Sequence, residues 1–215
     1  MGAIAVSGAG RAWGHRPLPR KAGSSGSFGC LRIVIAAVAA TLFLAACAPE
    51  YDWRDVRGPG GDYWVQLPAR PVTLTRRIHL EGHEVQMTMQ GAKVRDNAFT
   101  VALVPLPAPD AEAAGMTPER VLAAMREQML RNIGASPSTP TRAVAVGLVD
   151  AEGRKAGQTQ LQAVSARGAG RHADMQLHGR FGLWQGHALQ IVGVGPELDP
   201  QQTEHFLDSL RLVKR

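Results

Sequence analysis

Cysteine, aromatic side chains and long apolar runs are all scarce in this sequence of 215 residues. It contains two cysteines, Cys30 and Cys47, and only 5% of its residues are aromatic. Its longest mainly apolar stretch, residues 33–46, has 14 residues, whereas a helix that spans a bilayer needs roughly 20. Two cysteines cannot build a disulfide-rich scaffold or a cysteine-rich metal site. The short apolar stretch suits a signal peptide better than a membrane span.

Acidic residues are missing from the first 46 positions, whereas five basic residues precede or adjoin the apolar stretch. The stretch ends in Leu44-Ala45-Ala46-Cys47. A basic flank, an apolar run and small residues before a cysteine, in this order, match the lipobox of bacterial lipoproteins. The match predicts a signal peptide over residues 1–46, cleavage between Ala46 and Cys47, and acylation of Cys47 with fatty acids such as palmitate. The five basic residues are Arg11, Arg16, Arg20, Lys21 and Arg32.

Removal of residues 1–46 changes what the composition implies. The whole chain has a formal charge of +6, which would favour nucleic acid as a partner. All five basic residues before Cys47 would be lost, which leaves 19 basic and 18 acidic residues, so we expect no nucleic-acid binding. Cys30 would also be lost and the sulfur of Cys47 would become a thioether, so the mature chain is expected to have no free thiol and no disulfide.

The predicted anchor also indicates where the protein resides. Two or more acyl chains on Cys47 would hold it stably on a membrane. Ala48 and Pro49 follow Cys47, whereas an aspartate there commonly marks lipoproteins that stay in the inner membrane. We therefore expect attachment to the outer membrane of a cell with two membranes, with the domain facing the periplasm. Residues 47–61 are polar and rich in glycine and proline near their end, which predicts a tether.

Alternation of apolar and polar residues predicts strands over residues 63–67, 72–80, 85–89 and 99–103. In the second of these, Val72, Leu74, Ile78 and Leu80 share one face, which is expected to be buried. Glu81-Gly82 predicts a tight turn between neighbouring strands. Further strands are predicted over residues 143–149, 159–165, 175–184 and 187–194, and Gln185-Gly186 predicts a hairpin that pairs Trp184 with His187 and Leu183 with Ala188.

Two helices are predicted from their caps. Thr117 and Pro118 begin a helix that ends at Gly134, and Asp199 and Pro200 begin a second helix. Met125 and Met129 of the first helix are expected in the core. Strands joined by tight turns, with two helices packed on them, predict one α+β domain over residues 62–215 with a mainly antiparallel sheet.

Four segments carry a resemblance to an uncharacterised family of proteobacterial lipoproteins: residues 51–58, 63–68, 87–93 and 206–210. The resemblance implies no established activity. The order of an opening strand that ends in Leu-Pro, a middle helix, a terminal hairpin and a closing helix is also similar to the PsbP-like α/β/α sandwich. Since PsbP-like proteins are mostly binding and assembly modules, this similarity implies a binding function by analogy.

The motifs of common catalytic and metal sites are missing. His79 and His83 lie around a hairpin turn and not on one helix face, so a metal site would require His172, His178 or His187 to converge there. There is no Gly-x-Ser-x-Gly motif, and none of the serines has an evident histidine partner. The serines considered are Ser136, Ser138, Ser165 and Ser209. We therefore predict no catalytic residues, no metal ligands and no cofactor.

Two basic groups are candidate contact surfaces for anionic lipid headgroups, lipopolysaccharide phosphates or an acidic partner. One is the loop with Arg167, Arg171 and His172. The other is the strand segment with Arg76, Arg77 and His79.

The function expected from the sequence is that of a membrane-anchored, non-enzymatic lipoprotein whose domain binds another envelope component. The alternative is a small metal-binding or hydrolytic module that uses the hairpin histidines. A third hypothesis is that the protein binds a small apolar ligand between helix and sheet, near Met125, Met129 and Phe206.

Overall fold

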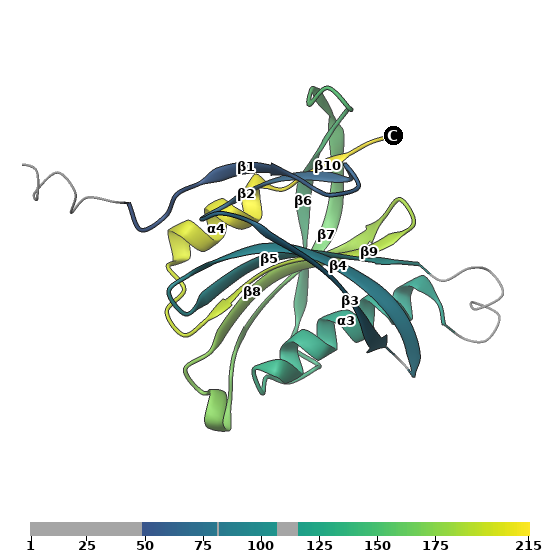
Figure 1. The fold of residues 1–215 in the computed structure, drawn as a ribbon. Coiled ribbons are helices and arrows are strands. Elements are labelled where there is room, and N and C mark those ends of the chain that lie inside the picture. The colour runs from purple at the N-terminus through teal and green to yellow at the C-terminus, as the bar shows by residue number, and fades with distance from the viewer. Residues whose placement is uncertain (1–48, 81, 107–115) are drawn as a thin grey trace, which may run out of the picture. The chain divides into compact units, whose positions relative to one another are not determined.

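The computed structural model describes residues 49–80, 82–106 and 116–215, and these belong to one compact unit, Pro49–Arg215. The predicted signal peptide, its cleavage point and Cys47 lie outside the described residues. Ten strands in the described part form one curled sheet in the order β1-β2-β10-β6-β7-β8-β9-β5-β4-β3 (Figure 1). Neighbouring strands are antiparallel except for β10 and β6, which are parallel.

The bounds of the elements follow the chain. The strands are β1 Arg54–Arg57, β2 Tyr63–Leu67, β3 Val72–Leu80, β4 His83–Val94, β5 Asn97–Pro105, β6 Thr141–Val149, β7 Lys155–Arg167, β8 Gln176–Trp184, β9 His187–Gly195 and β10 Arg211–Val213. The helices are α3 Pro118–Asn132 and α4 Pro200–Ser209, and a short 3₁₀ turn, η1, spans Gly170–His172.

The α+β class predicted from the sequence, with its PsbP-like sandwich, is wrong, because the described chain is mostly β. The two predicted helices and the mainly antiparallel pairing are present, but the helices are minor parts of a ten-stranded fold. Strand β1 lies in the stretch expected as tether, and β10 follows the last helix directly. Strand β1 adds to the edge of the sheet beside β2, and β10 joins β2 to β6, so that all ten strands belong to one curled layer.

The central strands β5 and β9 are buried on both faces. On one face, Phe99 and Val101 of β5 belong to the core around α4. On the other, Ala102 and Val104 belong to the core beneath α3. Successive side chains of a strand point to opposite faces, so the two helices cover opposite faces of the same strands.

Helix α4 lies inside the curl, between β1–β2 and the strands β5, β8 and β9 (Figure 1). The Asp199 side chain caps it by accepting a hydrogen bond from the Gln202 backbone N–H at 2.9 Å, as predicted. Phe206 is fully buried, and its ring meets that of Phe99 edge-to-face with centroids 5.3 Å apart. This contact ties the last helix to the middle of the sheet.

Helix α3 covers the opposite face. Thr117 caps it by accepting a hydrogen bond from the Arg120 backbone N–H at 3.4 Å, and Pro118 is its first residue, as predicted. Met125 is buried in the core, which confirms its predicted role. The β8–β9 hairpin has the predicted register, with Trp184 opposite His187 and Leu183 opposite Ala188.

The N-terminal segment docks on α4. Trp53 Nε1 donates a hydrogen bond to Gln202 Oε1 at 3.1 Å, and the Trp53 ring meets the His205 ring with centroids 4.5 Å apart. Tyr51 stacks on Trp53 and meets Phe99 edge-on. The chain is therefore held against the domain from Tyr51 onward.

Tyr63 makes the stability of this fold sensitive to alkaline pH. Its side chain is buried, its hydroxyl donates to Gln90 Oε1 at 3.2 Å, and burial raises its pKa well above the ordinary value. The hydroxyl therefore stays neutral in the folded state at a pH where the unfolded chain ionises. We expect stability from this group to be complete below the unfolded pKa of about 10 and to be lost as the pH rises above it.

Urea unfolding on either side of this pH checks the expectation. Tyr63→Phe should flatten the alkaline decline in the free energy of unfolding, whereas Tyr51→Phe, a change at the less buried tyrosine, should alter it less. Equal slopes for wild type and Tyr63→Phe would contradict the assignment.

Candidate functional site

An apolar groove of about 390 Å³ opens at one edge of the sheet. Its lining residues come from the start of β3, the end of β4 and the start of β5: Arg70, Val72, Leu74, Met89, Gly91, Ala92, Lys93, Ala98 and Thr100. Val72 and Leu74 are 69% and 49% exposed. An exposed apolar patch with a hollow in it is typical of a binding surface.

The strand register explains the shape of the groove. Val72, Gly91 and Thr100 form one cross-strand row. Gly91 has no side chain in the middle of this row, and a Cβ there would lie 2.6 Å from the Phe99 carbonyl oxygen. The sheet packing therefore requires glycine at this position, and the missing side chain deepens the groove.

Helix α3 leaves this part of its sheet face uncovered. It packs on β8, β9 and β3, and its core includes Leu80 and Met87, which lie toward the β3–β4 turn. Leu74 pairs with Met89 and Val72 with Gly91, farther from that turn. The expectation that the whole apolar face of residues 72–80 is buried is therefore wrong for Val72 and Leu74.

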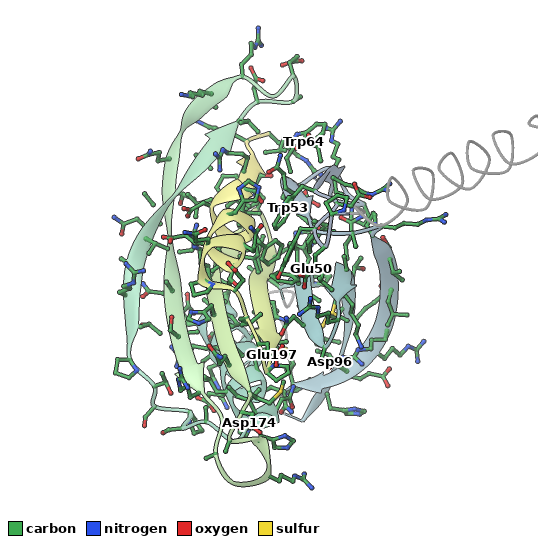
Figure 2. All side chains as sticks on the ribbon, turned by 90° about the vertical axis from the view of Figure 1, so that its left-hand side faces the viewer. Glu50, Trp53, Trp64, Asp96, Asp174 and Glu197 are labelled. Carbon is green, nitrogen blue, oxygen red and sulfur yellow. The ribbon has the colours of Figure 1, made fainter. Side chains whose placement is uncertain are left out.

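Basic residues border the groove. Arg70 and Lys93 line it, and both are exposed. Arg76 pairs with Met87 and so shares a sheet face with Leu74. The turn between β4 and β5 contributes Arg95, which is paired with Glu50, and Asp96 (Figure 2). The groove is thus apolar in its floor and cationic along its rim.

The basic residues predicted as contact surfaces do not form one site. Arg76 and Arg77 lie on opposite faces of β3, and Arg77 is paired with Glu84 at 3.2 Å. His79 lies opposite Glu84 on β4. Of these three residues, only Arg76 shares the face of the groove.

The second predicted group lies far from the first. Arg167 ends β7, while Arg171 and His172 lie in η1, where Arg171 Nε donates to His172 Nε2 at 3.1 Å. Strand β7 is separated from β3 by β8, β9, β5 and β4. The register also places Arg167 and Arg77 toward opposite ends of the strands.

The histidines do not converge on a metal site. His83 pairs with Leu80 and His79 with Glu84, so the two histidines project from opposite sheet faces. Within the part of the chain that the structure describes, no group of three or more histidine, cysteine, aspartate or glutamate residues could hold a metal ion.

One serine does have a histidine partner, so the prediction that none of the serines has one is wrong. Ser165 of β7 lies directly opposite His178 of β8, and Ser165 Oγ is 3.0 Å from His178 Nδ1. Burial, and then the nearby Arg167, lower the pKa of His178, which favours the neutral ring. Nucleophilic catalysis also needs a group that orients the histidine, and no carboxylate among the described residues hydrogen-bonds to His178. The pair is not evident in the sequence because it depends on the register of two long strands.

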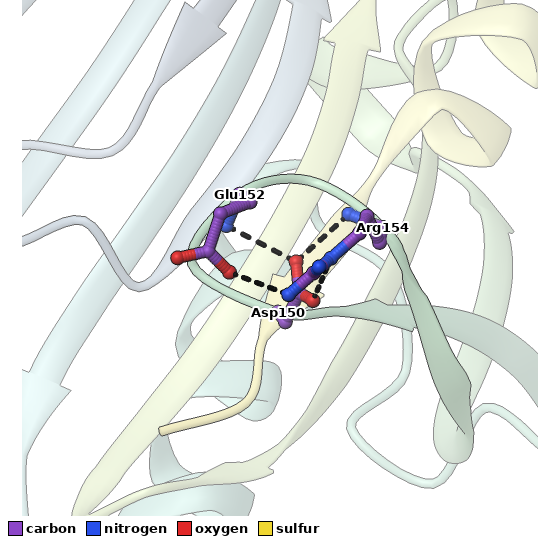
Figure 3. Close-up of polar contacts among 3 residues, drawn as sticks. All are labelled: Asp150, Glu152 and Arg154. Atoms are coloured by element: carbon purple, nitrogen blue, oxygen red, sulfur yellow. Dashed lines mark hydrogen bonds and ion pairs between the residues drawn. The ribbon is translucent and has the colours of Figure 1, made fainter.

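Another polar cluster, of Asp150, Glu152 and Arg154, occupies the β6–β7 turn (Figure 3). Asp150 accepts hydrogen bonds from the backbone N–H groups of Glu152 and Arg154 and is paired with the Arg154 Nε at 2.6 Å. Burial raises the pKa of Asp150, but the hydrogen bonds and charge of Arg154 outweigh it and lower the pKa below its usual value. These groups satisfy one another, so the cluster closes the turn.

The chain matches no protein-family model and no curated protein. The described residues contain no helix long and apolar enough to cross a bilayer. The resemblance to a lipoprotein family therefore remains a prediction from the quoted segments.

Proposed function

We propose that this protein is a membrane-anchored, non-enzymatic lipoprotein whose domain binds another component of the cell envelope. The anchor would be acylated Cys47, in the outer membrane of a cell with two membranes, with the domain facing the periplasm. The anchor rests on the lipobox sequence. The binding function rests on one structural observation, the exposed apolar groove around Val72 and Leu74.

The groove supports binding for a physical reason. Burial of exposed apolar side chains is favourable by about 25 cal/mol per Å², and the floor of the groove is already shaped by packed strands. A partner can therefore bind there without a large conformational change. The rim of Arg70 and Lys93 favours a partner that carries negative charge next to apolar groups.

Photocrosslinking in intact cells tests this proposal. A photoreactive amino acid in place of Leu74 should form a covalent adduct with an envelope component, which mass spectrometry of the purified adduct identifies. The same amino acid in place of Glu152, in the distant β6–β7 turn, is the control. No adduct at Leu74, or the same adduct at both positions, would contradict binding at the groove.

A further inference from the structure

The described chain begins at the same end of the sheet as the groove. Glu50 makes two contacts with Arg95 of the β4–β5 turn, Oε1 to Nε at 2.9 Å and Oε2 to Nη2 at 3.1 Å. Lys93 and Ala98, which line the groove, are paired next to this turn. The chain therefore enters the domain at the turn end of the sheet, where the groove also ends, and from Tyr51 onward it packs on the opposite, α4 face.

This position limits the distance between the groove and the predicted anchor. Cys47 precedes Glu50 by three residues, which span at most about 10 Å when fully extended. If Cys47 is acylated, its acyl chains enter the bilayer within that distance of Glu50. The membrane surface then lies close to the same end of the sheet as the groove.

The chemistry of this surface fits an anionic bilayer. Val72 and Leu74 present apolar side chains to solvent, and Arg70, Arg76 and Lys93 surround them with positive charge. Glu50 is paired with Arg95, which leaves Asp96 as the acidic residue of the adjoining turn. Apolar side chains within a basic surface bind the boundary between headgroups and acyl chains of anionic membranes.

We propose that the groove is a second membrane contact that seats the domain on anionic phospholipid. Val72 and Leu74 enter the headgroup region, and Arg70 and Lys93 contact lipid phosphates. This inference rests on the proposed anchoring and names the partner of the groove. It gives the lipidated domain one fixed orientation, with the β4–β5 turn toward the membrane.

An environment-sensitive fluorophore on the lipidated protein tests the orientation. The mature chain is predicted to have no free thiol, so Leu74→Cys gives a single labelling site. Reconstituted into phosphatidylglycerol vesicles, this label should shift to the blue relative to the same label on the unit Pro49–Arg215 in buffer without vesicles. A label at Leu183→Cys is the matched control. Leu183 is also a leucine on the surface, 37% exposed, but it lies on β8 beside the β8–β9 turn, at the other end of the sheet from the β4–β5 turn. Equal spectra at the two positions would overturn the proposal.

Vesicle sedimentation of the unit Pro49–Arg215, which lacks the anchor, measures the contact alone. Circular dichroism first verifies that each protein is folded. Wild type should bind vesicles that contain phosphatidylglycerol, bind phosphatidylcholine vesicles more weakly, and lose affinity as salt increases. The double variant Val72→Asp and Leu74→Asp should bind at least about tenfold more weakly, and Leu183→Asp should bind as wild type does.

The remaining outcomes overturn the inference. One is that wild type does not bind anionic vesicles, and another is that wild type and the double variant bind them equally. A third is that the double variant differs from wild type only in self-association, as measured by sedimentation velocity. A protein adduct at Leu74 in cells would keep the proposed binding function and replace phospholipid as the partner. An unmodified Cys47 would instead remove the anchor, so the two failures are distinguishable.

Discussion

Replacing Phe206 by alanine should lower the free energy of unfolding by about 3–5 kcal/mol. Phe206 is fully buried between the two halves of the curled sheet, and its ring packs edge-to-face against Phe99 at 5.3 Å between centroids. Alanine would leave a cavity at the point where α4 joins the sheet. An aromatic pair of this kind contributes about 0.5–1.5 kcal/mol beyond the area it buries, so the loss should lie at the upper end of the range.

Urea unfolding followed by circular dichroism measures this loss. Since domains of this size are stable by about 5–15 kcal/mol, Phe206→Ala could fall below the threshold for folding, and Phe206→Leu is the milder variant. Leu183→Ala, at an exposed position, is the control and should change stability by less than about 0.5 kcal/mol. A loss under about 1 kcal/mol for Phe206→Ala would show that α4 is not packed inside the curl.

The second large effect concerns Cys47. The lipobox interpretation predicts that Cys47→Ser stops acylation and cleavage. Unlike the mature protein, the variant should then retain residues 1–46, with their apolar stretch and five basic residues. Because the acyl chains supply the stable membrane attachment, the outer-membrane fraction should lose the mature protein. Immunoblots of fractionated cells would show a precursor that is larger by the signal peptide.

A control separates anchoring from folding. Cys30→Ser changes the other cysteine, in the segment expected to be removed, and should leave processing and fractionation as in wild type. Normal processing of Cys47→Ser would contradict the lipobox interpretation and leave the domain without a predicted anchor.

Local signals in the sequence predicted local structure well. Thr117 and Asp199 are the caps of the two helices, and Gln185-Gly186 forms the turn that fixes the β8–β9 register. Each of these features depends on residues a few positions apart. Hydrogen bonds from caps and the backbone geometry of a two-residue turn are enough to specify them.

Pairing between distant segments could not be predicted. The sheet is extended by β1 and β10, which are only four and three residues long, and β10 pairs in parallel with β6. Short strands give too few alternating positions to recognise. Val56 of β1 and Leu212 of β10 are buried in the same core cluster as Phe206 of α4, a contact between distant segments that no local pattern shows. The α+β prediction therefore underestimated the sheet.

The candidate groove illustrates the same limit. Alternation correctly placed Val72 and Leu74 on an apolar face, but it cannot say how far a helix covers that face. Helix α3 ends its cover near Leu80 and Met87, and the two residues beyond it stay exposed. An apolar residue that tertiary structure leaves uncovered looks, in the sequence, the same as one in the core.

The most direct test of the account is the mass of the mature N-terminus. The protein extracted from membranes and digested should yield an N-terminal peptide that begins at Cys47 and carries the mass of a diacylglycerol group, with or without a further acyl chain on its amine. An N-terminus before Cys47, or an unmodified Cys47 at the start of the chain, would contradict the central claim that this domain is held at a membrane by that residue.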